Sequence, residues 1–178
     1  MSIYNPIIRK INNQIKVKCW NYLKNNNLAN RGTYDGNKEK QFTGLVGELE
    51  THNLLFGYYP DLNKKENGFD GGVDIVYRNV GIDVKTMGRN FYTKAEWVNN
   101  FPKLQEGYNC DILLFNSINK KTNYIEFCGW VWKRELKEKA RFYKKGTIRD
   151  RGLNDKMPVL TDNYEINNTD LRDIRSII

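Results

Sequence analysis

Two aspartates and a lysine lie in adjacent stretches of alternating sequence near the middle of the chain. Asp74 belongs to the run Val-Asp-Ile-Val-Tyr, and Asp83 and Lys85 belong to the run Val-Gly-Ile-Asp-Val-Lys, with Arg78 and Asn79 between them. If the runs pair as a hairpin turning at Arg78 and Asn79, Asp74 lies directly opposite Asp83. Lys85 then follows two residues later on the same face.

The hydrophobic pattern favours this register. A shift by one residue would mix apolar and charged side chains on both faces, whereas this register separates them. The apolar face then collects Val73, Ile75, Tyr77, Val80, Ile82 and Val84.

Facing carboxylates destabilise a sheet unless a cation lies between them or one is protonated. Mg²⁺ meets this need, because it takes oxygen ligands from a few carboxylates, water and phosphate. A neighbouring lysine can orient or deprotonate a water, or balance charge on a phosphate. The arrangement therefore suits metal-assisted phosphodiester hydrolysis, and a plain salt bridge among Asp74, Asp83 and Lys85 on an exposed hairpin is the alternative.

Other catalytic chemistries lack their parts. The 178 residues include one histidine, His52, and no Gly-x-Ser-x-Gly segment, which disfavours Ser/His/Asp hydrolases. Cys19, Cys110 and Cys128 are widely spaced and form no Cys-x-x-Cys pair, so a zinc site is not expected. We expect three buried, reduced thiols in a reducing compartment.

The formal net charge of +8 is concentrated near the two ends of the chain. Residues 1–24 carry five basic and no acidic residues, and residues 131–156 interleave aromatic rings with basic side chains. Such segments suit a phosphate backbone and its bases, although an ordinary solvated surface is the alternative. The candidate nucleic-acid contacts are Arg89, Lys94, Lys133, Arg134, Arg141, Lys144, Lys145, Arg149 and Arg151.

The elements around the hairpin follow from periodicity. Helical spacing predicts helices over residues 3–24, 38–56 and 133–145, and alternation predicts strands over 73–77, 80–87, 112–118 and 124–131. We therefore expect an α/β (α+β) fold with a central mixed sheet flanked by helices. The chain is expected to be a single domain, 1–178, with a basic N-terminal helix and loop (1–37), a catalytic core (38–145) and a C-terminal extension (146–178).

These residues resemble the PD-(D/E)XK nuclease superfamily. The resemblance covers Asp74, the triplet Asp83-Val84-Lys85 and the preceding helix with its Gly-Leu-Val-Gly-Glu segment ending at Glu48. It implies a restriction-endonuclease-like core in which Asp74, Asp83, Glu48 and the Val84 carbonyl bind Mg²⁺, with Mn²⁺ as a substitute. Lys85 would position or activate the attacking water. Val73 replaces the proline of the motif, and Asp83 stands where glutamate is more usual.

The helix ligand has two candidates. On a helical wheel Glu48 and Glu50 flank the apolar stripe at similar angles, so geometry alone does not choose between them. The Gly-Glu context of the resemblance favours Glu48. His52 lies one turn later on the same side, and we interpret it as a packing or surface residue.

The sequence thus predicts a Mg²⁺-dependent deoxyribonuclease, an endonuclease rather than an exonuclease, acting on duplex or branched DNA. A homodimer is expected if both strands are cut, because each cut needs an active site. The alternatives are a catalytically inactive DNA-binding module on the same fold and an RNA-directed nuclease. No apolar run is long enough to span a membrane, so a cytoplasmic or other intracellular location is expected, with a viral or mobile-element origin left open.

Overall fold

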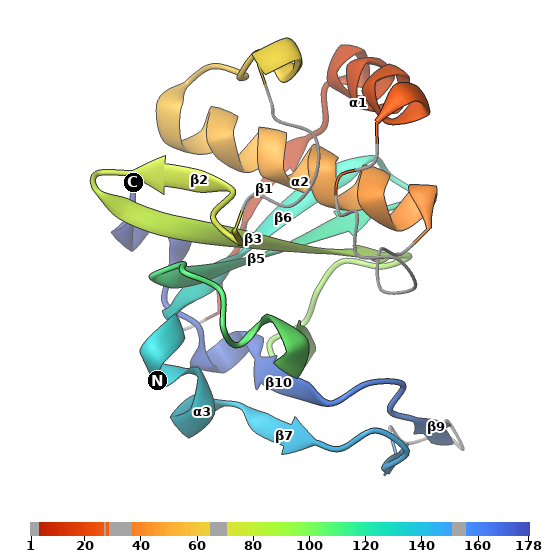
Figure 1. Ribbon diagram of the computed structural model, residues 1–178, viewed down its shortest axis with the longest axis vertical. Coiled ribbons are helices and arrows are strands. Elements are labelled where there is room, and N and C mark those ends of the chain that lie inside the picture. Colours follow the sequence, from red (N-terminus) through yellow and green to blue (C-terminus); the bar gives the residue numbers. More distant parts are fainter. Residues whose placement is uncertain (1–3, 27, 29–36, 65–70, 151–155) are drawn as a thin grey trace.

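The computed structural model describes residues 4–26, 28, 37–64, 71–150 and 156–178. Its architecture is a mixed α/β fold (Figure 1). The helices are α1 (Asn13–Asn25), α2 (Lys38–Phe56) and α3 (Leu136–Lys139). The strands are β1 (Ile7–Lys10), β2 (Ile75–Tyr77), β3 (Val80–Arg89), β4 (Val98–Pro102), β5 (Ile112–Asn119), β6 (Tyr124–Trp132), β7 (Arg141–Tyr143), β8 (Ile148–Asp150), β9 (Lys156–Pro158) and β10 (Asn163–Asn167).

A five-stranded sheet with the order β1-β6-β5-β3-β2 forms the centre of the molecule. β3 and β5 run parallel, and every other neighbouring pair in this sheet is antiparallel. A smaller sheet, β4-β10-β7, lies beyond the opposite face of the main sheet from α1 and α2 (Figure 1). The sheet is thus covered on both sides, which explains why nearly all of β5 is buried.

Two hydrophobic clusters fill the spaces between these layers. Ile112 and Leu114 of β5 belong to the cluster beneath α1 and α2. Leu113 and Phe115, which alternate with them, belong to the cluster that contains Phe101 of β4. The period-two alternation of the strand therefore supplies side chains to both clusters.

Helix α2 occupies the predicted residues. The Asn37 side chain accepts a hydrogen bond from the Lys40 amide at 2.9 Å, which caps the first turn. Gly57 ends the helix with φ of +80°, and its amide donates to the Asn53 carbonyl at 3.0 Å. The apolar stripe of α2 packs on β3, and Gly47 lies so close that an added Cβ would overlap the Thr86 side chain.

The expected helix over residues 3–24 is wrong in its first part. Residues Ile7–Lys10 form β1 and pair with β6, and the helix begins only at Asn13. The Asn12 side chain accepts from the Gln14 amide at 2.9 Å, so it caps the helix at this point. The preceding isoleucines instead give the edge of β6 a partner strand, which removes unpaired backbone groups there.

The expected helix over residues 133–145 is also wrong. A 3₁₀ turn, Lys133–Glu135, leads into the short α3, and Arg141–Tyr143 then forms β7 beside β10. Within α3 only Leu136 is buried, so the segment lacks the continuous apolar stripe of a longer helix. Pairing with β10 overrides the local helix preference.

Candidate functional site

The hairpin of β2 and β3 has the predicted register from Ile75 to Ile82. Ile75 pairs with Ile82, and Tyr77 pairs with Val80. Arg78 and Asn79 both have positive φ, +50° and +65°, as a two-residue type I′ turn requires. The separation of faces is confirmed for Ile75, Ile82 and Val84, which lie in the cluster beneath α2. Val73, expected on the same face, instead packs against the cluster that contains Phe101, because the chain departs from the regular register before Ile75.

Asp74 departs from the expected position opposite Asp83. Its amide donates to the Ile82 carbonyl at 2.9 Å, although Ile82 already pairs with Ile75. Two consecutive residues therefore face one partner, which is the pattern of a β-bulge. The Asp74 carboxylate accepts a hydrogen bond from the Val84 amide at 2.6 Å, and this bond holds it at the edge of β3.

The start of this hairpin is held from the other side by Tyr108. Gly72 has φ of +85°, and an added Cβ there would overlap the Tyr108 side chain. The Gly71-Gly72 pair thus permits a close approach that the hairpin pattern alone does not predict. Tyr108 thus packs closely on the backbone at Gly72, two residues before Asp74.

Asp83 and Lys85 form an ion pair on the face of β3 that points away from α2. Lys85 Nζ lies 2.6 Å from Asp83 Oδ1, and the side chains are only 19% and 2% exposed. Asp83 Oδ2 is buried and has no hydrogen-bond partner among the described residues. A buried carboxylate oxygen in this state is unfavourable unless a cation or proton completes it.

The surroundings of Asp83 are largely apolar. The Lys85 ammonium lies 5.8 Å from the centroid of the Phe101 ring. Burial, and then the nearby charge of Asp83, raise the pKa of the Cys110 thiol to about 11. Cys19, Cys110 and Cys128 are all buried free thiols, as the sequence predicts.

A cavity of about 560 Å³ lies on the α2 side of the hairpin, with Glu48, His52 and Asp74 among its lining residues. His52 Nδ1 donates to the Tyr58 carbonyl at 3.0 Å, and its ring stacks on Phe56, so it has packing partners here. Glu48 and Asp74 thus share a cavity, while Asp83 and Lys85 lie on the other face of β3. The structure therefore places the four predicted residues as two pairs on opposite faces of β3: Glu48 of α2 shares a cavity with Asp74, and Asp83 pairs with Lys85.

Glu50 occupies a different environment. It is 2% exposed, and the Tyr59 hydroxyl donates to its two oxygens at 3.2 and 3.3 Å. Burial raises the pKa of this carboxyl, against the lowering effect of a hydrogen bond from the Asn12 backbone. Glu48 lines the same cavity as Asp74, whereas Glu50 does not.

The residues around Asp83 offer some, but not all, of the oxygen ligands that a hard cation takes. Among the described residues no group of three or more His, Cys, Asp or Glu side chains is close enough to hold a metal. Mg²⁺, however, is commonly held by one or two carboxylates with water and substrate phosphate. The unsatisfied Asp83 Oδ2 provides one such donor, and the Asp74 carboxylate lies at the edge of β3, on the Val84 amide. Val84 itself can offer only its backbone carbonyl, because its side chain has no ligand atom.

The predicted nucleic-acid contacts fall into two groups. Three of them are engaged within the fold: Arg89 donates to the Val98 carbonyl, Lys133 to the Tyr108 carbonyl, and Arg149 pairs with Glu165. Arg151 lies outside the described residues. The exposed members are Lys94, Arg134, Arg141, Lys144 and Lys145.

Comparison with known proteins gives no relative: no family model, no curated protein and no solved structure matches this chain. Within the described ranges, no helix is long and apolar enough to cross a membrane. The chemistry of the site therefore has to be argued from its own residues.

Proposed function

We propose that the chain is a Mg²⁺-dependent DNA nuclease built on a restriction-endonuclease-like core. The observation that carries the proposal is the buried Asp83 carboxylate, with one oxygen on Lys85 and the other without a hydrogen-bond partner in the described chain. A carboxylate oxygen of this kind is suited to a divalent cation, and Asp74 is a second carboxylate at the edge of the same strand. The order α2, β2, β3, β5, β6 supports the core assignment.

The roles of the side chains follow from their positions. Asp83 and the Val84 carbonyl would hold the cation, and Asp74 would reach it from the edge of β3, where the Val84 amide holds its carboxylate. Glu48 lines the cavity on the opposite face of β3 from Asp83, so its predicted role as a ligand of the same cation stays a prediction. When bound, Mg²⁺ supplies a Lewis acid for the scissile phosphate and lowers the pKa of water. Lys85 would orient the attacking water, whose proton leaves to solvent. As the new P–O bond forms and the P–O bond to the leaving sugar oxygen breaks, the Lys85 ammonium would donate a proton to that oxygen.

The substrate class is proposed from charge. The exposed cations Arg141, Lys144 and Lys145 lie in and just after β7, and a chain of net charge +8 attracts a polyanion. An endonuclease that cuts both strands would act as a homodimer, with one site for each strand.

The direct test is cleavage. Purified protein is incubated with supercoiled, linear, single-stranded and branched DNA, and with RNA, in Mg²⁺ or in a chelator. The proposal expects cleavage of DNA in Mg²⁺ alone, with Mn²⁺ as a substitute. A folded protein that cuts none of the DNA substrates in either metal would contradict it, and cleavage of RNA alone would assign an RNA-directed nuclease.

One observation favours a second candidate, a DNA-binding module without catalysis. Asp83 is 2% exposed and already paired with Lys85, so a substrate phosphate reaches this pair only if the cover near Phe101 moves. This candidate expects salt-dependent DNA binding and no cleavage. The same assay separates the two functions.

A further inference from the structure

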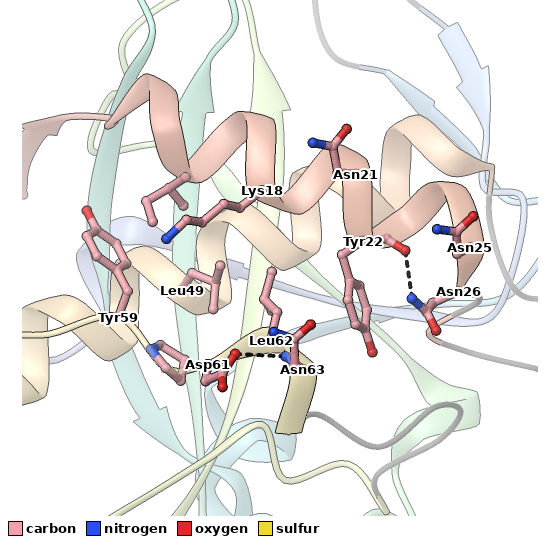
Figure 2. A pocket seen from close by; sticks show the side chains of 12 residues that line it. Lys18, Asn21, Tyr22, Asn25, Asn26, Leu49, Tyr59, Asp61, Leu62 and Asn63 are labelled. Carbon is pink, nitrogen blue, oxygen red and sulfur yellow. Dashed lines mark hydrogen bonds between the residues drawn. The ribbon is translucent and has the colours of Figure 1, made fainter.

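A second cavity, of about 620 Å³, opens beside the candidate site (Figure 2). Helix α1 forms one wall, the segment from Tyr59 to Asn63 forms the facing wall, and Leu49 of α2 contributes between them. The volume falls within the range of about 300–1,000 Å³ that is usual for small-ligand sites.

The chemistry of the walls is unusual for a surface hollow. Two tyrosine rings, Tyr22 and Tyr59, come from facing elements (Figure 2). Around them lie Lys18 and several groups that can donate or accept hydrogen bonds. These polar lining residues are Asn21, Asn25, Asn26, Asp61 and Asn63.

Several of these groups are held in place by local bonds. Asp61 accepts from the Asn63 amide at 3.0 Å, and the Asn26 side chain donates to the Tyr22 carbonyl at 2.8 Å. The Asn63 side chain is exposed at the cavity rim. A planar ligand that enters would therefore meet aromatic surface first and amide groups at its edge.

The two cavities share a wall. Leu49, Tyr59, Pro60, Asp61 and Leu62 line both of them. The hollow with the tyrosines therefore adjoins the one that contains Glu48 and Asp74 along this shared segment. A strand bound at the candidate catalytic hairpin could place an adjacent nucleotide here.

We propose that this cavity binds an unpaired base of the DNA substrate. The inference rests on the proposed nuclease function and adds the substrate class: DNA with an unpaired nucleotide, such as a bulge, flap or branch. An unpaired base presents a flat ring for stacking on tyrosine and a hydrogen-bonding edge for asparagine and aspartate. Lys18 would meet the phosphate of that nucleotide.

The geometry disfavours an ordinary paired base. A base in a continuous duplex is stacked and paired, so it must first be extruded, whereas an unpaired base pays little of that cost. The cavity therefore predicts a preference between substrates rather than only a gain in overall affinity.

The test measures binding in a chelator, so that cleavage plays no part. The full chain is titrated by fluorescence anisotropy into a continuous duplex and into the same duplex with one unpaired adenosine. We expect tighter binding of the second DNA by about tenfold, the size of one base–aromatic stacking contact.

Three variants locate the preference. Tyr22→Leu removes the ring but keeps apolar bulk, and Lys18→Ala with Asn63→Ala removes polar contacts at exposed positions; both should reduce the ratio of affinities toward one. Lys24→Ala, which removes another exposed cation from α1 outside the cavity, should leave the ratio unchanged. Circular dichroism confirms that each variant is folded.

The outcomes are separable from those of the cleavage assay. Equal affinity for the two DNAs, or a preference that survives both cavity variants, would overturn the inference even if DNA is cleaved. A preference that disappears in both cavity variants would support it even if no cleavage occurs. Lys85→Arg should keep the preference, because Lys85 lies on the other face of β3.

Discussion

Asp83 and Glu126 are both buried acids of the main sheet, 2% and 1% exposed, yet their surroundings differ. Both oxygens of Glu126 accept from the Thr93 amide, at 3.0 and 2.9 Å, and the Thr93 hydroxyl adds a third bond at 2.8 Å. Asp83 has one ion pair and an oxygen without a partner in the described chain. Both oxygens of Glu126 therefore have hydrogen-bond donors, whereas Asp83 Oδ2 has none among the described residues.

This difference distinguishes a buried acid with a structural role from a buried acid that could bind a cation. A satisfied carboxylate stabilises the loop that donates to it. An unsatisfied one is unfavourable until a cation or proton arrives, and such positions are where function is expected. The predictions below change one side of this comparison at a time.

The largest effect is expected at Lys85. Lys85→Arg keeps the positive charge beside Asp83, but a guanidinium does not give up or take a proton at neutral pH. We expect the rate of plasmid nicking in Mg²⁺ to fall by about 10²–10⁴-fold, the usual contribution of a positioned acid or base.

The matched control is Lys120→Arg, which changes an exposed lysine paired with Glu39. Its nicking rate should equal that of the wild type. If Lys85→Arg nicks as fast as the wild type, Lys85 has no role in proton transfer.

The second effect concerns Glu126. Glu126→Gln keeps one oxygen that both Thr93 donors can reach, but it replaces the second oxygen with an NH₂ group that opposes the Thr93 amide N–H, and it removes the charge from these hydrogen bonds. We expect the free energy of unfolding to fall by about 1–3 kcal/mol, measured by urea denaturation. Glu138→Gln, at an exposed position of α3, should change the free energy of unfolding little. If Glu126→Gln has the same free energy of unfolding as the wild type, the Glu126 carboxylate does not stabilise the fold.

The third effect tests how closely α2 must approach the hairpin. Gly47→Ala would push a methyl group into Thr86 and should destabilise the fold by about 1–3 kcal/mol. Gly44→Ala meets no atom within 4 Å, so helix propensity should stabilise it by up to about 1 kcal/mol. In thermal melts we expect Gly47→Ala to lower the melting temperature and Gly44→Ala to raise it. Equal shifts in melting temperature would mean that the contact between Gly47 and Thr86 does not hold α2 in place.

The smallest effect is a pH dependence at Glu50, a third buried acid. Burial raises the pKa of its carboxyl above the ordinary value of 4.5, so the folded state favours the protonated form. Wild-type stability should therefore lose this contribution as pH rises from about 4.5 through the raised pKa. Glu50→Gln, which is neutral throughout, should gain stability relative to wild type over that window in denaturation at stepped pH; a constant difference would contradict the assignment.

The sequence predicts best where one pattern dominates. Helical spacing over residues 38–56 predicts α2, and the separation of faces together with the Arg78-Asn79 turn predicts the pairing of β2 with β3. The helix predictions failed at residues 7–10 and 141–143, because these residues form strands whose partners, β6 and β10, are distant in sequence. Short strands with such partners have little local signal.

The site was predictable in its residues but not in its arrangement. Alternation assigns Asp83 and Lys85 to one face, yet it contains no sign of the bulge that moves Asp74 to the strand edge. The burial of Asp83 depends on distant residues such as Phe101 of β4, a strand that the sequence pattern did not predict. The cavity between α1 and the Tyr59–Asn63 segment likewise arises only from tertiary packing.

The most direct test of the central claim is metal binding at Asp83. Mn²⁺ is titrated into the wild type, Asp83→Asn and Glu126→Gln, and free Mn²⁺ is followed by electron paramagnetic resonance at a temperature where all three are folded. The account predicts that wild type and Glu126→Gln bind Mn²⁺ alike, and that Asp83→Asn binds at least about tenfold more weakly because a carboxylate ligand is lost. Equal affinity in wild type and Asp83→Asn would contradict it.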